Sequence, residues 1–465
     1  MIIEGSRFDS APPWFREATE RQILDPSPLM KIAFIFPPIW PSDTDGSLQI
    51  WNREVTKRLA RTCEIVVYSG KFSQIPQDQI DGVADRRLST RWDSRFLKYS
   101  QLFYNAIGID LPPFASDLWY PWYAFRIALE IRKRACDVVH VYNYPQFCPI
   151  IKFLNPNARI VLNMHGELLT QISFKNLQNR LSQIDAIICC SEFVSKPIRS
   201  NFPAIAHRCK TVPMGISPVA FATARHALKN TAARRLLYVG RVSPEKGIHV
   251  LLDAFEIIVR RYPDATLTIV GPEWIPPRGY LADLCLERKV VDGFAHFYEG
   301  NYIQKLRDNL SQEAAKRVTF AGFVPHRDVP SFYVDADIYV SPSFYESFGM
   351  SLIEAMAAGL PVVAARGGAV ADLISDCKNG LLVEPANPAA IANAVETLLG
   401  KPELRNSIAC RGRKMVCRQF SYESITSELL QLYQNIVARH EESREQSTNL
   451  PTLSPDVQTS KSKSD

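Results

Sequence analysis

Two carboxylates flank a short glycine-containing stretch in the second half of the chain. The stretch is Ser343-Phe-Tyr-Glu-Ser-Phe-Gly-Met-Ser-Leu-Ile-Glu354, which places Glu346 and Glu354 on either side of Gly349. The apolar segment 336–341 before it favours a buried strand, and the helix-forming segment 352–359 after it ends in glycine. Amide groups at the start of such a helix can bind a diphosphate. A carboxylate further into the helix can accept hydrogen bonds from sugar hydroxyls, so the pattern indicates a phosphorylated, hydroxyl-rich ligand.

A second candidate anion site opens this half of the chain, in Tyr238-Val-Gly-Arg-Val-Ser-Pro-Glu-Lys-Gly247. Ser243 and Pro244 suit the N-cap and the first position of a helix. Arg241 then follows the carboxyl end of a strand, where ligands bind in open sheets. Lys246 lies in the first helical turn, where a cation opposes the helix dipole. Neutralisation of a diphosphate would explain a cation at that position.

The elements that must position these residues alternate between strand and helix in two halves. Short apolar runs predict strands in the first half at residues 31–36, 64–68, 138–142, 160–164 and 186–189, with a helix at 50–60. Those in the second half predict strands at 235–239, 265–270, 318–321, 337–340, 361–364 and 380–383, with a helix at 244–261. Apolar runs bounded by helices indicate α/β architecture, with two doubly wound parallel sheets covered on both faces.

The composition fits a globular protein with two domains and argues against several classes. The chain has 465 residues, of which 46% are hydrophobic, and no apolar run reaches the roughly 18–20 residues that span a bilayer. Residues 1–29 carry several carboxylates and no apolar segment, which argues against a secretory signal. The ten cysteines form no Cys-x-x-Cys pair, so we expect free thiols in a reducing cytoplasm.

The positive charge is concentrated in the first half of the chain. Residues 1–230 hold 28 Lys and Arg against 20 Asp and Glu, a balance of +8, whereas the whole chain has +6. These charges fit ordinary solvated faces, or contact with an anionic acceptor or the inner face of a membrane. The basic residues grouped for this are Arg86, Arg87, Arg91, Arg95, Lys98, Arg132, Lys133 and Arg134. Nucleic-acid binding is not expected, because no recognised module appears and aromatic residues are not seen to alternate with the basic ones.

Taken together, these motifs resemble those of the retaining glycosyltransferases of family 4. The resemblance covers about residues 31–440 and is more specific in the second half. It rests on Gly240-Arg241, Lys246-Gly247, Phe323-Val324, the Glu346 to Glu354 spacing and Gly367-Gly368. It implies the GT-B fold, in which two Rossmann-like domains face each other across a central cleft.

The strand and helix pattern and the polar stretches, taken with the resemblance, predict the following division of the chain. Residues 1–29 would be an extension, 30–214 the acceptor-side domain and 215–230 a linker. Residues 231–418 would bind the nucleotide sugar, 419–440 would form a terminal helix and 441–465 a disordered tail. Residues 274–312 form an insertion in the second domain, with a role that the sequence does not indicate.

Four residues would serve catalysis if the family's roles hold here. Arg241 and Lys246 would bind the diphosphate, and Glu346 would contact the transferred sugar near the reacting centre. His165, at the end of a predicted strand, would hydrogen-bond the donor sugar or its phosphate. Glu354 would bind the ribose hydroxyls.

The remaining donor contacts would come mainly from the backbone. The amides of Phe348, Gly349 and Met350 would meet the phosphates or the sugar, and Val324 would lie against the base beside Phe323. Gly46 opens a helix after the first strand, where the family often has two glycines but this chain continues with a serine.

The implied reaction transfers a sugar from a UDP- or GDP-sugar to a hydroxyl of a glycan, lipid or small-molecule acceptor, with retention of configuration. No cofactor or obligatory metal is implied, because the spacing Asp335-Ala-Asp337 falls at a helix end and a strand start. The alternatives are a non-catalytic nucleotide-sugar-binding protein and a nucleotide-sugar epimerase. A dinucleotide-dependent oxidoreductase is disfavoured, since no Gly-x-Gly-x-x-Gly follows a strand.

Overall fold

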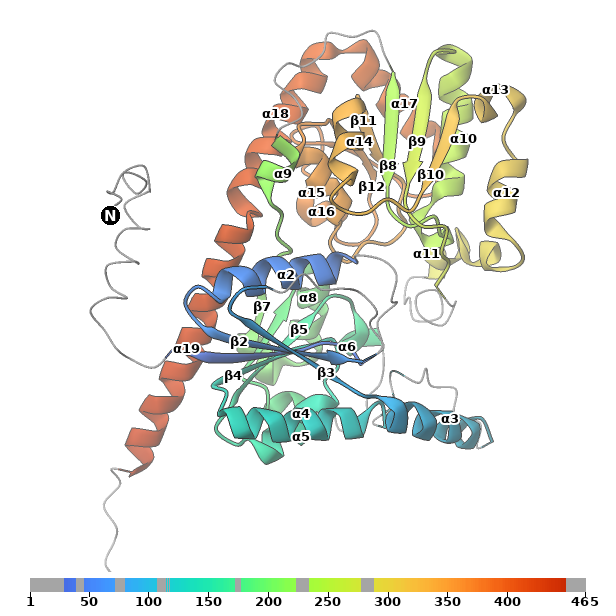
Figure 1. Cartoon of the computed structure of the whole chain (residues 1–465). Helices are drawn as coiled ribbons and strands as arrows, with labels where there is room; N and C mark the ends of the chain where they lie inside the picture. Colours follow the sequence, from blue (N-terminus) through green and yellow to red (C-terminus); the bar gives the residue numbers. More distant parts are fainter. Residues whose placement is uncertain are drawn as a thin grey trace, which may run out of the picture.

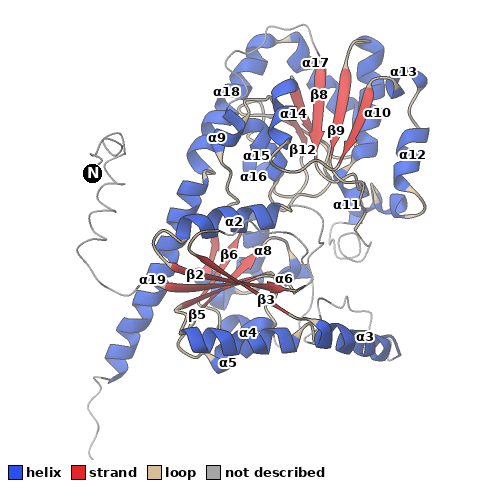
Figure 2. Ribbon diagram, in the orientation of Figure 1, coloured by secondary structure: helices blue, strands red, loops and turns tan. Residues whose placement is uncertain are grey.

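Two parallel β-sheets, each flanked by helices, form the body of the molecule (Figure 1). The computed structural model describes residues 29–38, 46–71, 80–106, 114, 116, 118–171, 177–222, 234–276 and 288–448. The predicted α/β class with two doubly wound sheets is confirmed. Figure 2 shows the sheets one above the other, with helices between and outside them.

The first sheet has strand order β3-β2-β1-β4-β5-β6-β7, and every pairing is parallel. Its strands are β1 (Lys31–Ile35), β2 (Glu64–Gly70), β3 (Val83–Leu88), β4 (Val138–Tyr142), β5 (Arg159–Met164), β6 (Ala186–Cys189) and β7 (Cys209–Thr211). Its helices are α2 (Ser47–Leu59), α3 (Arg91–Ala106), α4 (Pro121–Arg134), α5 (Phe147–Leu154), α6 (Leu168–Gln171), α7 (Leu177–Ser182) and α8 (Glu192–Asn201). Strands β4, β5 and β6 are buried along their whole length, as strands covered on both faces must be.

The second sheet has strand order β10-β9-β8-β11-β12-β13, again parallel throughout. Its strands are β8 (Arg235–Val239), β9 (Thr266–Val270), β10 (Val318–Gly322), β11 (Ile338–Ser341), β12 (Val362–Ala365) and β13 (Leu381–Val383). Its helices include α10 (Ile248–Arg261), α14 (Val329–Asp335), α15 (Met350–Ala357), α16 (Val370–Leu373), α17 (Pro388–Gly400) and α18 (Pro402–Gln419). The carboxyl ends of parallel strands share one edge of each sheet, and ligands bind at that edge.

The last helix, α19 (Tyr422–Thr448), returns from the second half to pack against the first sheet and α2 (Figure 1). The hydroxyl of Tyr433 lies 2.7 Å from Nδ1 of His140 in β4, and both side chains are buried. Asn163 donates from Nδ2 to Nε2 of His140 at 3.0 Å, so Nδ1 carries the proton and donates to Tyr433. Arg58 of α2 also pairs with Glu423 at 2.8 Å.

Several predicted boundaries need correction. The helix expected from residue 244 begins at Ile248, because Pro244–Lys246 forms a 3-10 turn and Gly247 is left-handed, with φ +69°. Edge strands β3 and β7 were not predicted. Helix α19 continues through residues 441–448, where a disordered tail was expected, and residues 449–465 lie outside the described part.

The segment 274–312 contains short helices where it is described. They are α11 (Arg288–Asp292), η5 (Ala295–Tyr298) and α12 (Tyr302–Asp308), and α13 (Gln312–Ala315) follows. The linker region 215–230 includes the short helix α9 (Pro218–Ala222), and residues 223–230 are outside the described part. The nine cysteines of the described residues are all free thiols.

Candidate active site

Three glycines bring the loop that carries Glu346 against two neighbouring loops. A Cβ atom at Gly247 would lie 2.3 Å from the carbonyl oxygen of Pro342, and one at Gly367 would lie 2.3 Å from that of Ser343. At Gly368, which has φ +61°, the added atom would lie 2.3 Å from the carbonyl oxygen of Glu346. Only glycine permits such close backbone approach, so these loops form one packed unit.

The two predicted donor-site charges of this unit contact each other. Nζ of Lys246 donates to Oε1 of Glu346 at 2.6 Å, and the two side chains are 16% and 15% exposed, respectively. The hydroxyl of Ser343 donates to the same carboxylate oxygen at 2.9 Å. The structure therefore joins the cation expected at the diphosphate to the carboxylate expected at the sugar.

Arg241 lies at the other end of the same turn and is held from two sides. Its Nη2 donates to Oε1 of the buried Glu245 at 2.9 Å, and its guanidinium lies 5.2 Å from the centre of the Trp274 ring. Glu245 also accepts hydrogen bonds from Ser243 at 2.6 Å and Tyr298 at 3.2 Å. Planar stacking and a fixed carboxylate orient a guanidinium fork toward a defined direction.

Glu354 lies inside α15 and is nearly buried, and both of its oxygens have partners. Oε1 lies 3.0 Å from Nε2 of His326, and Oε2 accepts from the hydroxyl of Tyr333 at 2.9 Å. The ring of Phe221, in α9, packs against both partners, with centroids 6.2 Å from His326 and 5.7 Å from Tyr333. Because each carboxylate oxygen has two lone pairs, Glu354 keeps capacity to accept hydroxyl donors.

The predicted backbone donors begin helix α15. Gly349 is its N-cap with φ +102°, a conformation that favours glycine, and Met350 is its first residue. Phe348 is buried, so its side chain is not exposed to a ligand. Val324 is half-buried against the core, whereas Phe323 beside it is 46% exposed.

In the first half, His165 follows β5 directly and is enclosed by aromatic rings. Its ring centre lies 5.9 Å from that of Tyr142 and 5.8 Å from that of Trp51, which belongs to α2. Burial lowers the pKa of His165 to about 3, so its imidazole is neutral at neutral pH. Its Nε2 is buried without a partner among the described residues. Gly46 is the N-cap of α2, and its amide donates to Oε1 of Gln49 at 2.9 Å.

The strand-end loops of the two halves meet beside Glu346. A Cβ atom at Gly166 would lie 3.8 Å from Oγ of Ser347, and the hydroxyl of Tyr345 donates to Oε2 of Glu167 at 2.8 Å. Ser191 of the first half donates its hydroxyl to the carbonyl of Ser347 at 2.7 Å. The segment containing His165 therefore lies across from the segment containing Glu346.

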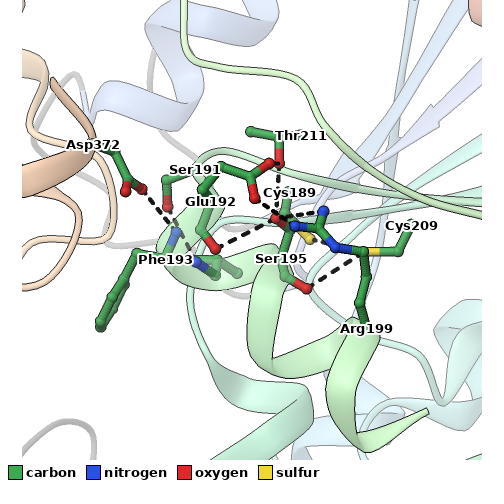
Figure 3. A network of polar contacts seen from close by, with 10 residues as sticks. Cys189, Ser191, Glu192, Phe193, Ser195, Arg199, Cys209, Thr211 and Asp372 are labelled. Carbon is green, nitrogen blue, oxygen red and sulfur yellow. Dashed lines mark hydrogen bonds and ion pairs between the residues drawn. The ribbon is translucent and has the colours of Figure 1, made fainter. Parts of the chain in front are cut away.

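Asp372 contacts the first domain in this structure. Its Oδ2 accepts from the amide of Phe193 at 2.8 Å, at the start of α8, as Figure 3 shows. A carboxylate is favourable at that position because the first amides of a helix have no partner within the helix. Behind it, Glu192 pairs with Arg199 and accepts from Thr211, which fixes the same helix end to β7 (Figure 3).

Sequence reasoning missed several partners of the predicted residues. These are Ser343, Glu245, Trp274, His326 and Tyr333. The sequence did contain a signal for His326. This residue follows Val324 shortly after strand β10, so it lies at the carboxyl-end edge of the second sheet, where ligands bind. Within the described residues no group of three or more His, Cys, Asp or Glu side chains is gathered that could hold a metal ion.

Comparison with known proteins adds to this geometry. Residues 49–219 match the model "Glycosyltransferase Family 4", and residues 222–415 match "Glycosyl transferases group 1". The chain belongs to the family-4 type of glycosyltransferases. The two matches divide the chain at the same place as the two sheets, and the activity class is nucleotide-sugar glycosyl transfer.

Individual relatives are distant but extend over most of both chains. Spore coat protein SA of Bacillus subtilis is 25% identical over 87% of this chain and 99% of its own length. Lipopolysaccharide 1,2-N-acetylglucosaminetransferase of Salmonella typhimurium is 24% identical over 88% of this chain and 99% of its own. The Anabaena protein HepE, solved with UDP and glucose, superposes with TM-score 0.63 and 19% identity, covering 87% of this chain and all of its own. The predicted GT-B fold is thereby confirmed.

Proposed function

We propose that this glycosyltransferase moves a hexose from a UDP- or GDP-sugar to an acceptor hydroxyl with retention of anomeric configuration. The observation that carries the proposal is the contact between Lys246 and Glu346, with His165 on the loop opposite. It combines a cation for the diphosphate with polar groups for the sugar. The complex of HepE with UDP and glucose favours UDP over GDP for the first trials.

The reaction breaks the bond between the anomeric carbon and the diphosphate oxygen, and forms one to the acceptor oxygen. Negative charge grows on the departing diphosphate, where Arg241, Lys246 and the amides of residues 348–350 would stabilise it. The acceptor proton passes to an oxygen of the leaving phosphate. Neutral His165 would donate a hydrogen bond to the sugar or phosphate, while Glu346 orients the sugar and Glu354 the ribose.

The two domains would divide the substrates between them. We assign the donor to the second sheet, and the glycan, lipid or small-molecule acceptor to the first. The proposed location is the cytoplasm, with peripheral contact at the inner face of the membrane. Within the described residues, no helix combines the length and apolar character needed to cross a membrane.

The test is incubation of the purified chain with UDP- and GDP-sugars and a panel of hydroxyl acceptors, followed by NMR of the anomeric signal. A glycoside with the donor's anomeric configuration, formed equally with and without EDTA, is expected. An inverted product would refute retention, and loss of activity with EDTA would refute metal independence. Conversion of the donor sugar without any acceptor would instead identify an epimerase. Saturable donor binding without turnover across the panel would identify a binding protein.

A further inference from the structure

Exposed aromatic side chains concentrate on three helices of the first domain. Of the thirteen large hydrophobic side chains exposed in the described part of the chain, eight lie on or beside α3, α4 and α5. They are Trp92, Phe96, Tyr99, Leu118, Trp122, Phe125, Leu129 and Phe153. In Figure 2 these helices form the side of the first domain that points away from the second sheet. We call this set of side chains the aromatic face.

Helix α3 carries the clearest part of the aromatic face. Trp92, Phe96 and Tyr99 are 69%, 46% and 72% exposed, and their spacing places them on one side of the helix. A polar side chain would be expected at such exposed positions of a helix that serves only the core. The buried positions on the other side include Leu97, which packs into the core.

A row of cations lies beside the α3 aromatic residues. Arg91, Arg95 and Lys98 are exposed, each directly before an aromatic residue, and none forms an ion pair with a described residue. The guanidinium of Arg95 lies 6.0 Å from the centre of the Trp92 ring. Basic and aromatic residues therefore do alternate here, contrary to the expectation from the sequence.

The two helices that contribute most to the aromatic face are fixed to each other. Asp93 is buried, and its Oδ1 accepts from the amides of Trp122 at 2.9 Å and Tyr123 at 3.3 Å, at the start of α4. The rings of Trp122 and Phe125 then stack at 5.4 Å. Helices α3 and α4 are consequently held in a fixed relation to each other before any partner binds, which lowers the cost of ordering this surface.

We propose that the aromatic face, with the α3 cations, docks on an anionic lipid bilayer. Trp, Tyr and Phe side chains favour the boundary between headgroups and acyl chains, and Lys and Arg beside them attract anionic headgroups. A single-stranded nucleic acid could use aromatic residues and cations, but not Leu118, Leu129 and Phe153, which lie before α4, in α4 and in α5. The bilayer is therefore the partner that uses the whole surface.

The position of α3 relates this surface to the strand-end edge of the first sheet. Helix α3 starts directly after the carboxyl end of β3, at the sheet edge that also carries His165. Docking would place the bilayer against the side of the first domain away from the second sheet, with the start of α3 at the strand-end edge. The proposal rests on the membrane contact in the proposed function and assigns a surface to it, but vesicle binding is measured without substrates, so its failure would leave the proposed glycosyl transfer standing.

The test is co-sedimentation of the full chain with phosphatidylcholine vesicles, with and without phosphatidylglycerol. The cation variant replaces Arg91, Arg95 and Lys98 by serine. It should lower partitioning to the anionic vesicles about 100-fold, since each Lys or Arg near such a surface contributes about a fivefold change. High salt should weaken binding of the unaltered chain.

A matched control exists on the second domain. Helix α18 presents Arg411, Lys414 and Arg418 as an exposed row with similar spacing and without exposed aromatic neighbours. Replacing these three by serine changes the net charge equally and should leave vesicle binding nearly unchanged. Equal losses in the cation and control variants would overturn the proposal in favour of net charge alone.

An aromatic variant, with Trp92, Phe96 and Tyr99 replaced by serine, separates insertion from charge. It should retain its fold, because these side chains are exposed, and should lose most binding to anionic vesicles. Three results would overturn the proposal. The first is vesicle binding of the aromatic variant equal to that of the unaltered chain, and the second is self-association of the unaltered chain that this variant abolishes. The third is binding of the unaltered chain to a single-stranded oligonucleotide but not to vesicles. The second result would assign the aromatic face to another copy of the chain, and the third to nucleic acid.

Discussion

Replacing Lys246 by alanine should weaken nucleotide binding more than it weakens the fold. Its Nζ lies 2.6 Å from Glu346, and it is the cation proposed for the diphosphate. A charge-assisted hydrogen bond contributes about 1.5–3 kcal/mol, so the Kd for UDP should rise roughly 10- to 150-fold. The pair is neither fully exposed, where pairs contribute up to about 1 kcal/mol, nor fully buried, where breaking one costs about 3–5 kcal/mol. We therefore expect a stability loss of about 1–2 kcal/mol.

The assay is calorimetric titration with UDP, paired with urea unfolding of each variant. Lys401→Ala is the matched control, because this lysine is exposed between α17 and α18 of the same domain. It should change neither quantity. An unchanged Kd for UDP in folded Lys246→Ala would refute the assignment of Lys246 to the diphosphate.

A double-mutant cycle with Glu346→Gln separates two ways in which Lys246 could act. If Lys246 meets the phosphates directly, its removal should weaken UDP binding by a similar factor in the Glu346→Gln background. If it only neutralises Glu346, the loss should disappear there, because the glutamine carries no charge to repel the diphosphate. Glu346→Gln alone should leave UDP affinity nearly unchanged and reduce turnover, since UDP lacks the transferred sugar.

Three further perturbations test the structure around the site. Gly368→Ala should lower the free energy of unfolding by about 1–3 kcal/mol and reduce donor affinity, because the residue has φ +61° and an added Cβ would overlap the backbone of Glu346. Gly400→Ala is the control, because an added Cβ meets nothing there, and it should change neither quantity. Tyr433→Phe should cost about 1–3 kcal/mol in urea unfolding, because it leaves the buried His140 Nδ1–H unpaired, and an unchanged midpoint would contradict that bond. Burial lowers the pKa of His140 well below its usual value and that of His165 to about 3, so both resist protonation when folded, whereas both bind protons below about pH 6.5 when unfolded. The contribution of these two histidines to the free energy of unfolding should therefore be present above pH 6.5, and should fall by about 2 kcal/mol between pH 6.5 and about pH 5.5. Urea unfolding at these two pH values measures the difference.

The central strands could be predicted from the sequence because burial on both faces leaves a continuous apolar run. The prediction for β4 matches the observed bounds, and that for β5 begins one residue late. Edge strand β3 was missed because it reads Val83-Ala-Asp-Arg-Arg-Leu88, with exposed charges in its middle. Strand β7 is too short for any periodicity to show.

Contacts that depend on tertiary placement could not be predicted in the same way. The motif placed Glu346 and Lys246 at strand ends of one sheet, but their direct contact depends on Gly247 and Gly368, which set how closely the loops approach. The α3 cations were grouped by charge alone. Their adjacency to Trp92, Phe96 and Tyr99 is present in the sequence, but the exposure of these aromatic side chains is known only from the structure.

The position of Glu346 depends on both halves of the molecule, although its motif belongs to one. Its neighbour Tyr345 donates a hydrogen bond to Glu167 of the first half, and the carbonyl of Ser347 accepts one from Ser191. Its own carboxylate accepts from Lys246 of the second half. Any separation of the two sheets would break the first two contacts and leave the third. The carboxylate would then keep its charge partner but lose the backbone restraint on both sides. The first domain therefore helps to shape the proposed donor site, in addition to carrying the residues opposite it.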